Sequence, residues 1–354
     1  MLYSSSVWKN DLDTALSILP ELSGKAPCSV LVTGSTGLIG TAVVHLLLRF
    51  NDTSDSKIDV LATGRAIERV KEHFSDLLDR EDLFFAPFDA ADPDLSGFKN
   101  IDYIIHAASP ASPDAIVKNP VETFESNTAG LKALLDFSKD NGVKRLLFVS
   151  SSEVYGKKSQ DTPSLEDEYG FIDPLLPRNS YSIGKRAGEN LCASFLSEYD
   201  VDSVIVRPGH IYGPTASPSD IRVSSSWAYD AAKGKDIVMK SSGEQIRSYC
   251  YCLDCATAIM KVLFEGKSGE AYNISNRESI MSIADLADTI SSVSGVSLIK
   301  EIPTEEERRA FNPMKNSSLD SNKLESLGWK GLFDGKTGVS HTIGILREVN
   351  GFGQ

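Results

Sequence analysis

The sequence predicts an α/β fold, in which a doubly wound parallel sheet is followed by a smaller C-terminal α/β part. Short apolar segments that read as buried strands alternate with helical segments from Cys28 to Arg207, and this alternation is typical of parallel sheets. After Pro214 the alternation loosens. The chain has 354 residues, enough for one large or two ordinary domains with a substantial core.

Composition excludes several classes of protein. A hydrophobic content of 41% and a charged content of 24% are those of a globular protein. The net charge of −13 leaves no basic surplus to neutralise phosphates, so we expect no nucleic-acid partner. No apolar run is long enough to span a bilayer, and the N-terminus lacks the pattern of a secretory signal. Together with five cysteines, an odd number, these features predict a cytoplasmic protein with no membrane partner.

Three regions follow from the pattern along the chain: residues 1–27, 28–214 and 215–354. In the first, Asp11 to Leu22 carries leucine and isoleucine at helical spacing, and Pro27 ends any helix there. We therefore expect a helical lead-in packed on the outside of the core. The third region is expected to bind substrate, and segments of it can return to the sheet.

The first strong signal is a glycine-rich turn between a strand, Cys28 to Thr33, and a helix, Thr41 to Phe50. Here Gly34 allows a tight turn, Gly37 lets the backbone approach a pyrophosphate, and Gly40 lets helix and strand pack closely. The alternative is a turn that holds no ligand. We interpret it as a Rossmann-type dinucleotide site formed by Gly34, Ser35, Thr36, Gly37, Leu38, Ile39 and Gly40.

The second strand, Ile58 to Thr63, lacks the acidic residue that often binds the ribose hydroxyls of NAD. Arg65 stands where a 2′-phosphate would be met, so NADP remains an alternative to NAD. Arg65 is otherwise a solvated loop residue. Asp89, after the third strand, is a candidate for the adenine end of the cofactor.

The next strand, Ile101 to Ile105, is followed by His106 and then by small residues. Ala107, Ala108 and Ser109 leave room for a cofactor at the end of the strand, whereas His106 is interpreted as an ordinary packed histidine. The other predicted strands are Asp82–Phe88, Arg145–Ser150, Ser203–Arg207, Asp236–Lys240 and Arg247–Leu253. The other predicted helices are Val121–Asp140, Tyr181–Tyr199, Ser225–Lys233, Asp254–Phe264 and Ile283–Ser294, with a further helix that closes at Trp329.

Tyr181 and Lys185 lie four residues apart, so they share one face of a helix. A phenol is a poor base at neutral pH, but a lysine ammonium one turn away favours the phenolate and lowers its pKa. Tyr181 would then take a proton from a sugar hydroxyl, Lys185 would hold a nicotinamide ribose, and Ser151 would steer the same substrate oxygen. The glycine turn, the serine at a strand end and this helix occur in the order that such chemistry requires.

From Val30 to Trp329 the sequence resembles the extended short-chain dehydrogenases/reductases of the nucleotide-sugar epimerase/dehydratase group. The resemblance rests on the glycine turn, Ser152 to Gly156, Tyr181 with Lys185, and Arg207 to Pro214. Within the group it is most similar to UDP-glucuronate decarboxylases (UDP-xylose synthases). The motifs shared with them are His106 to Pro113, Asn127 to Gly130, and Pro177 to Tyr181.

The resemblance implies a nucleotide-sugar enzyme whose bound NAD transiently oxidises C4 of the sugar. Glu153 would be a second acid/base, and the resulting ketone would make a neighbouring carbon easy to deprotonate or decarboxylate. The resemblance also implies a homodimer formed through the helices Val121–Asp140 and Tyr181–Tyr199. Further residues implied at the cofactor are Ala107, Ala108, Ser109, Asn127, Ser150, Pro208, His210 and Ile211. Those implied at the substrate are Ser109, Ser152, Glu153, Arg222 and Arg247, the arginines at the diphosphate.

Ser152 stands where 4,6-dehydratases place an aspartate, which weakens the case for dehydration. Glu153 is generally absent from plain 4-epimerases, which weakens the case for simple epimerisation. One departure counts against decarboxylation. The basic Arg-Lys-Pro stretch of the decarboxylases is replaced by Asn316-Ser317-Ser318, with Lys315 as a stand-in. The alternatives are an epimerase or 4,6-dehydratase, an NADPH-dependent ketoreductase suggested by Arg65, and a non-catalytic dinucleotide-binding sensor.

Cys250, Cys252 and Cys255 form the only cysteine cluster in the sequence. Structural zinc takes four ligands, and no histidine or fourth cysteine is near these three in sequence. We therefore predict no metal site and interpret the three as small buried side chains.

Overall fold

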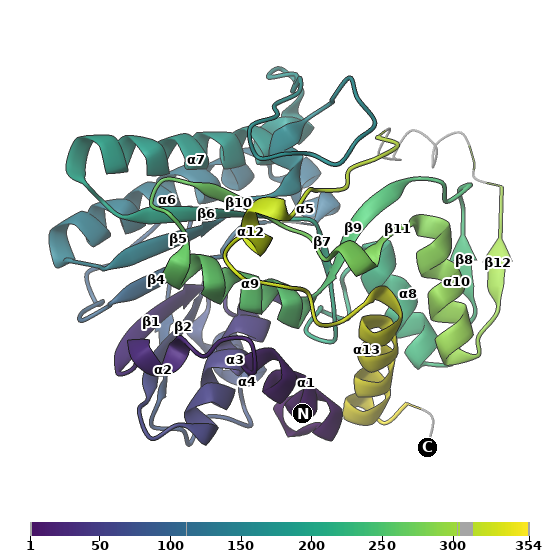
Figure 1. The fold of residues 1–354 in the computed structure, drawn as a ribbon, viewed down its shortest axis with the longest axis horizontal. Coiled ribbons are helices and arrows are strands. Elements are labelled where there is room, and N and C mark those ends of the chain that lie inside the picture. The colour runs from purple at the N-terminus through teal and green to yellow at the C-terminus, as the bar shows by residue number, and fades with distance from the viewer. Residues whose placement is uncertain (1, 111, 303, 305–313, 353–354) are drawn as a thin grey trace.

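The computed structural model describes residues 2–110, 112–302, 304 and 314–352 (Figure 1). Its centre is a seven-stranded parallel sheet with the order β10-β6-β5-β4-β1-β2-β3. The strands are β1 (Cys28–Thr33), β2 (Ile58–Gly64), β3 (Leu83–Pro87), β4 (Tyr103–His106), β5 (Arg145–Val149), β6 (Ser203–Pro208) and β10 (Ala271–Ile274). Strand order reverses direction at β1 and β4, so the predicted doubly wound sheet is confirmed.

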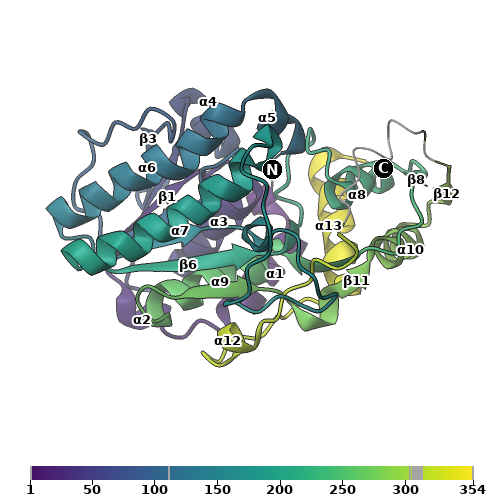
Figure 2. The same ribbon diagram turned by 90° about the horizontal axis from the view of Figure 1, so that it is seen from above.

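Helices cover both faces of this sheet. On one face lie α3 (Leu38–Thr53), α4 (Ile67–His73) and α9 (Cys252–Glu265), and on the other α5 (Pro113–Lys118), α6 (Pro120–Asn141) and α7 (Ser180–Tyr199) (Figures 1 and 2). Successive residues of β1 enter different cores: Val30 and Val32 belong to the larger cluster, Leu31 to a second one. A strand buried on both faces reads as a continuous apolar run, which is why its sequence predicts it well.

The C-terminal part forms two small sheets beside the large one. One contains β7 (His210–Tyr212), β9 (Ile246–Tyr251) and β11 (Ile280–Ser282), and the other β8 (Ile237–Met239) and β12 (Leu298–Lys300). Helices α8 (Val223–Ala232), α10 (Ile283–Ser294) and α13 (Gly335–Asn350) pack around them (Figure 2). The helix predicted to close at Trp329 is the short α12 (Asn322–Glu325), which ends before the buried Trp329.

The N-terminal region differs from its prediction in position and in role. Helix α1 spans Ser6–Leu16 instead of Asp11–Leu22, because the Ser5 hydroxyl caps it by accepting from the Trp8 N–H. The indole of Trp8 is fully buried and donates to His45 Nδ1 of α3 (3.0 Å). Asp11 accepts from the Tyr251 hydroxyl of β9 (2.8 Å). The lead-in is therefore part of the main core and joins the large sheet's helices to the C-terminal part. The short α2 (Leu22–Lys25) follows.

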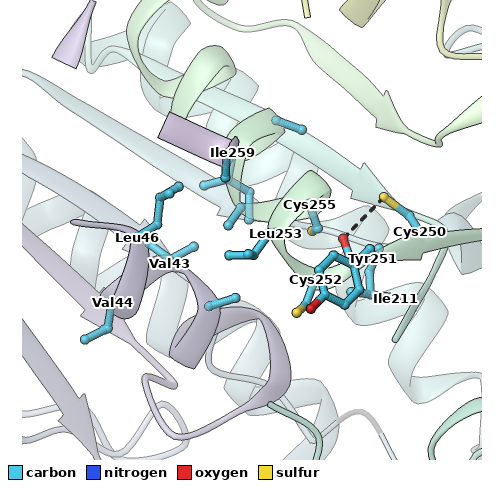
Figure 3. Close-up of a cluster of buried hydrophobic side chains, with 14 of the residues drawn as sticks. Val43, Val44, Leu46, Ile211, Cys250, Tyr251, Cys252, Leu253, Cys255 and Ile259 are labelled. Carbon is cyan, nitrogen blue, oxygen red and sulfur yellow. Dashed lines mark hydrogen bonds between the residues drawn. The ribbon is translucent and has the colours of Figure 1, made fainter. Parts of the chain in front are cut away.

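The three clustered cysteines lie in the larger core, as Figure 3 shows. Cys250, Cys252 and Cys255 are each fully buried, which confirms their interpretation as packed side chains. Within the described residues no group of three or more histidine, cysteine or acidic side chains is arranged to hold a metal ion. In the same part of the chain no helix has the length and apolarity needed to cross a membrane.

Candidate active site

The glycine turn closes tightly against the end of β4. Gly34 has a φ of +66°, and a Cβ on it would lie 2.8 Å from the backbone of Ala108. A Cβ on Gly40 would overlap the Gly34 carbonyl, and Gly37 is the N-cap of α3. The first turn of α3 therefore presents its backbone N–H groups at this edge of the sheet, an arrangement that suits an anionic ligand.

The residues after the central strands meet at the same edge. Thr33 pairs in register with Thr63 of β2 and His106 of β4, and the Ser35 N–H donates to the Thr63 carbonyl (3.1 Å). His106 is fully buried, lies 2.7 Å from Thr33 Oγ1 through Nδ1, and stacks on Phe148. Burial lowers the pKa of His106 to about 3. Its interpretation as an ordinary packed histidine is confirmed by this burial.

The end of β2 carries an ion pair that sequence reasoning missed. Arg65 Nη1 lies 2.9 Å from Glu122 Oε1, in the first turn of α6. Asp89, after β3, accepts a hydrogen bond from the Ala91 N–H (3.0 Å). The guanidinium of Arg65 therefore faces a carboxylate from another element.

Tyr181 and Lys185 are both buried on α7. Lys185 Nζ donates to the Val149 carbonyl (2.7 Å) and lies 4.7 Å above the Phe148 ring, and burial lowers its pKa to about 7. Burial raises the pKa of Tyr181 to about 12, although its interaction with the Ser151 hydroxyl opposes the rise. Desolvation outweighs the interactions that lower this pKa, and the expected lowering by Lys185 stays a prediction for the protein with its cofactor bound.

Glu153 lies near Tyr181 and is held by hydrogen bonds of its own, not by strand geometry. Ser151 is extended, yet Ser152–Tyr155 is a 3-10 helix, so strand alternation does not aim Glu153 beside Ser151. The Glu153 carboxylate instead accepts hydrogen bonds from Arg178 Nη1 and Nη2 (2.9 and 3.3 Å) and from the Ser182 hydroxyl (2.9 Å). Sequence reasoning missed Arg178, although it belongs to the Pro177–Tyr181 motif.

A buried ion pair joins β6 to α7, the helix that carries Tyr181 and Lys185. Arg207 of β6 binds both carboxylate oxygens of Glu189 on α7 (2.8 and 2.7 Å), and Ser150 donates to the same carboxylate (2.6 Å). Arg207 also donates to the hydroxyls of Tyr155 and Tyr169. Ser150 is predicted at the cofactor, but its hydroxyl is hydrogen-bonded to Glu189. The sequence signal that could have identified Glu189 is its position four residues after Lys185, on the same helix face.

Two arginines and a histidine lie on the C-terminal side. Arg247 is buried and donates to the carbonyls of Ile246 (2.8 Å) and Met314 (3.1 Å), and desolvation lowers its pKa. Arg222 pairs with Asp220, Nε lying 3.0 Å from Oδ1. Burial lowers the pKa of His210 to about 3, with Arg247 and then Arg222 adding to the effect. No described residue provides a partner for His210 Nδ1.

The remaining predicted residues occupy varied positions. Asn127 is buried in α6; its Nδ2 donates to the Thr123 carbonyl (2.7 Å), while Oδ1 has no partner among the described residues. Pro208 ends β6, and Ile211 of β7 pairs with Cys250. Ser109 lies in the segment after β4, and Ser152 begins the 3-10 helix. In the predicted motif His106–Pro113, Ala111 lies outside the described residues.

Known proteins share this sequence pattern and fold. UDP-glucuronic acid decarboxylase 1 of Xenopus tropicalis is 29% identical over 330 residues, covering 92% of this chain and 74% of that protein. UDP-glucuronic acid decarboxylase 6 of Arabidopsis thaliana is 31% identical over 247 residues, covering 70% and 69%. A trifunctional Arabidopsis thaliana UDP-glucose 4,6-dehydratase/3,5-epimerase/reductase is 30% identical over 330 residues, covering 90% of this chain and 47% of that protein.

Among solved structures, UDP-glucuronic acid 4-epimerase from Bacillus cereus, in complex with UDP-glucuronic acid and NAD, superposes with a TM-score of 0.77 at 23% identity, over 91% of this chain and 99% of that one. This similarity establishes the fold. The profile of the NAD dependent epimerase/dehydratase family matches residues 30–275, well over half of the chain. By this match, and by the relatives above 30% identity, the protein belongs to the NAD-dependent epimerase/dehydratase family of extended short-chain dehydrogenases/reductases.

Proposed function

We propose that the protein modifies the sugar of a nucleoside-diphosphate sugar through transient oxidation at C4, with decarboxylation of a uronate as the net reaction. The observation that carries this proposal is the gathering of Tyr181, Lys185, Ser151 and Glu153 at the sheet edge where Gly34 lies: Lys185 Nζ is 5.7 Å from the Tyr181 ring, and the Ser151 hydroxyl accepts from the Glu153 N–H. This arrangement offers one proton acceptor for a hydroxyl and a second acid/base nearby.

Bound NAD would accept the C4 hydride and later return it. The residues at this edge fit a dinucleotide. Gly37, the N-cap of α3, carries no side chain, and the first turn of α3 directs its N–H groups to the same place. Asn127 Oδ1 and His210 Nδ1 are buried polar atoms that find no partner within the described ranges. We assign Ala107, Ala108, Ser109, Pro208 and Ile211 to the cofactor as well, since they lie at or just after the ends of β4 and β6.

Tyr181 acts as the base toward the sugar hydroxyl, and Ser151 holds the same oxygen. With its pKa raised to about 12 in the chain alone, Tyr181 needs nearby positive charge to ionise at neutral pH. A cationic nicotinamide and a protonated Lys185 would provide that charge. Lys185 is oriented by the Val149 carbonyl and would also hold the nicotinamide ribose.

Glu153 is the second acid/base. Arg178 and Ser182 hold its carboxylate in one orientation, beside the phenol of Tyr181. A proton delivered to the carbon left by CO₂, or removed at a carbon next to the ketone, requires such a group within hydrogen-bond reach. Removal of Arg178 would free Glu153 to rotate, so Arg178 is a positioning residue.

The nucleotide end is assigned to Arg247 and Arg222. The guanidinium of Arg247 is buried and contacts carbonyl oxygens only among the described residues, which leaves its charge to be met by a diphosphate. Lys315 is exposed, and its carbonyl accepts from the Ile246 N–H. It is therefore a poor stand-in for the missing basic stretch, and Arg178, which pairs with Glu153, would meet a uronate carboxylate instead.

The experiment is a screen of UDP- and dTDP-linked sugars, including UDP-glucuronate, with released CO₂ and the product nucleotide sugar both measured. We expect CO₂ and a pentose product without net reduction of NAD, and a strongly reduced rate of product formation with Tyr181→Phe. A 4-epimer or a 4-keto-6-deoxy product without CO₂ would replace decarboxylation by epimerisation or dehydration. Net oxidation of NADPH would favour the ketoreductase, and no turnover of any sugar would favour a non-catalytic sensor.

We also propose a homodimer through α6 and α7. These helices pack side by side as the outer layer of one face (Figure 2). Val117 and Val121 expose 63% and 69% of their surface next to this layer, and Tyr199 at the end of α7 exposes 45%. Light scattering should give twice the chain mass, and Val121→Glu should give the monomer.

A further inference from the structure

The ion pair between Arg65 and Glu122 lies where the dinucleotide family places its ribose-binding acid, but the acid comes from a different element. Arg65 follows β2 directly, and Glu122 lies in the first turn of α6. The distance between Nη1 and Oε1 is 2.9 Å. The sequence offers a cation at this point, whereas the structure offers a cation already neutralised by a carboxylate.

The position of the pair relative to the cofactor edge follows from the neighbouring contacts. Ser35 of the glycine turn is bonded to Thr63, two residues before Arg65, and Phe88 donates to the Gly64 carbonyl. Helix α6 approaches the same edge, because a Cβ on Gly130 would overlap the Ala90 carbonyl just after Asp89. The pair therefore bridges β2 and α6 beside the residues assigned to the adenosine half of the cofactor.

We propose that Glu122 is a specificity-determining residue that makes the protein reject NADP in favour of NAD. This inference rests on the dinucleotide binding in the proposed function. A 2′-phosphate that reached Arg65 would have to displace Glu122 or come within a few ångströms of its negative charge, and both cost binding free energy. A 2′-hydroxyl carries no charge and meets no such repulsion, and the Glu122 carboxylate can accept its hydrogen bond.

Exposure of the pair makes this role testable without loss of the fold. The side chains expose 69% for Arg65 and 39% for Glu122, and ion pairs as exposed as this contribute little to stability. A structural role would therefore leave little trace in either cofactor's affinity, whereas a role in selection changes the ratio of the two affinities.

The test is to titrate NAD and NADP into the wild type, Glu122→Gln, Arg65→Ala and the double variant, and to measure binding by calorimetry. Glu122→Gln should tighten NADP by about tenfold or more and change NAD by less than about threefold, since one repelling charge is removed and Arg65 is released. Arg65→Ala should weaken NADP by a similar factor, and the double variant should fall between the two single variants. Glu125→Gln is the matched control, because Glu125 is exposed three residues further along α6.

The inference is overturned if the ratio of the dissociation constants for NADP and NAD in Glu122→Gln stays within about threefold of the wild-type ratio. It is also overturned if this ratio falls only because NAD binds less tightly. The assay needs no sugar substrate, so the two proposals fail separately. If neither dinucleotide binds the wild type, the proposed function fails and the inference with it. If both bind and the ratio does not move, only the role of Glu122 fails.

Discussion

The buried pair of Arg207 and Glu189 provides a quantitative test of how the site is supported. The side chains expose 2% and 10%, and Arg207 makes two bonds to the carboxylate, two to tyrosine hydroxyls and one to the Glu166 carbonyl. Arg207→Met removes the cation and leaves the Glu189 carboxylate buried with the Ser150 hydroxyl as its remaining partner. Breaking a buried pair in this way costs about 3–5 kcal/mol, because the remaining charge is not compensated.

Urea unfolding, monitored by circular dichroism, measures the loss in the free energy of unfolding for Arg207→Met, Glu189→Leu and the double variant. The double variant should lose less than the sum of the single losses by about 2 kcal/mol or more, since it leaves no unpaired charge. Arg277→Met is the control: its pair with Glu325 exposes 50% and 32%, and its loss should stay below about 1 kcal/mol. A loss below about 1 kcal/mol for Arg207→Met, or additive losses in the double variant, would refute the reasoning.

Three further predictions concern the chemistry of the site. Tyr181→Phe should keep the fold and NAD binding but lower turnover by about two to four orders of magnitude, measured with the substrate found in the screen; near-normal turnover would remove Tyr181 from the mechanism. Glu153→Gln should accumulate reduced cofactor and keto-sugar in a single turnover, followed by nicotinamide absorbance, whereas a complete reaction at the wild-type rate would contradict its role as second acid/base. The pKa of Lys185, lowered by burial from 10.5 to about 7, means that the folded state binds fewer protons than the unfolded state between these values, so stability should rise with pH across this window. Urea midpoints at several pH values should show a steeper rise for the wild type than for Lys185→Met, and parallel curves would show that Lys185 is not desolvated.

The match between sequence and structure is closest where local patterns decide the backbone. The apolar run of β1, the glycines after it and the helix that follows are fixed by steric and burial requirements within about a dozen residues. The placement of Tyr181 and Lys185 on one helix face follows from helical spacing alone. The cofactor edge and the order of its motifs could therefore be read in advance.

Long-range partners could not be read in the same way. Glu153 meets Arg178 across 25 residues, and Asp11 meets Tyr251 across 240. Strand β10 joins the large sheet beside β6 after the chain has built part of the C-terminal region. Nothing in the short apolar run of Ala271–Ile274 indicates which strand it pairs with, because strand pairing depends on which edge the rest of the chain leaves open.

The sequence by itself determined the fold class, the glycine turn and the presence of the tyrosine, lysine, serine and glutamate that we propose for catalysis. The tertiary structure determined the partners, orientation and ionisation of these and neighbouring side chains. It gave Arg65 a carboxylate partner, gave Glu153 its orientation through Arg178, and raised the pKa of Tyr181 where the local pattern predicted a fall. The physical reason is that burial and opposing charges act through space, so their sum at one atom depends on elements that are distant in sequence.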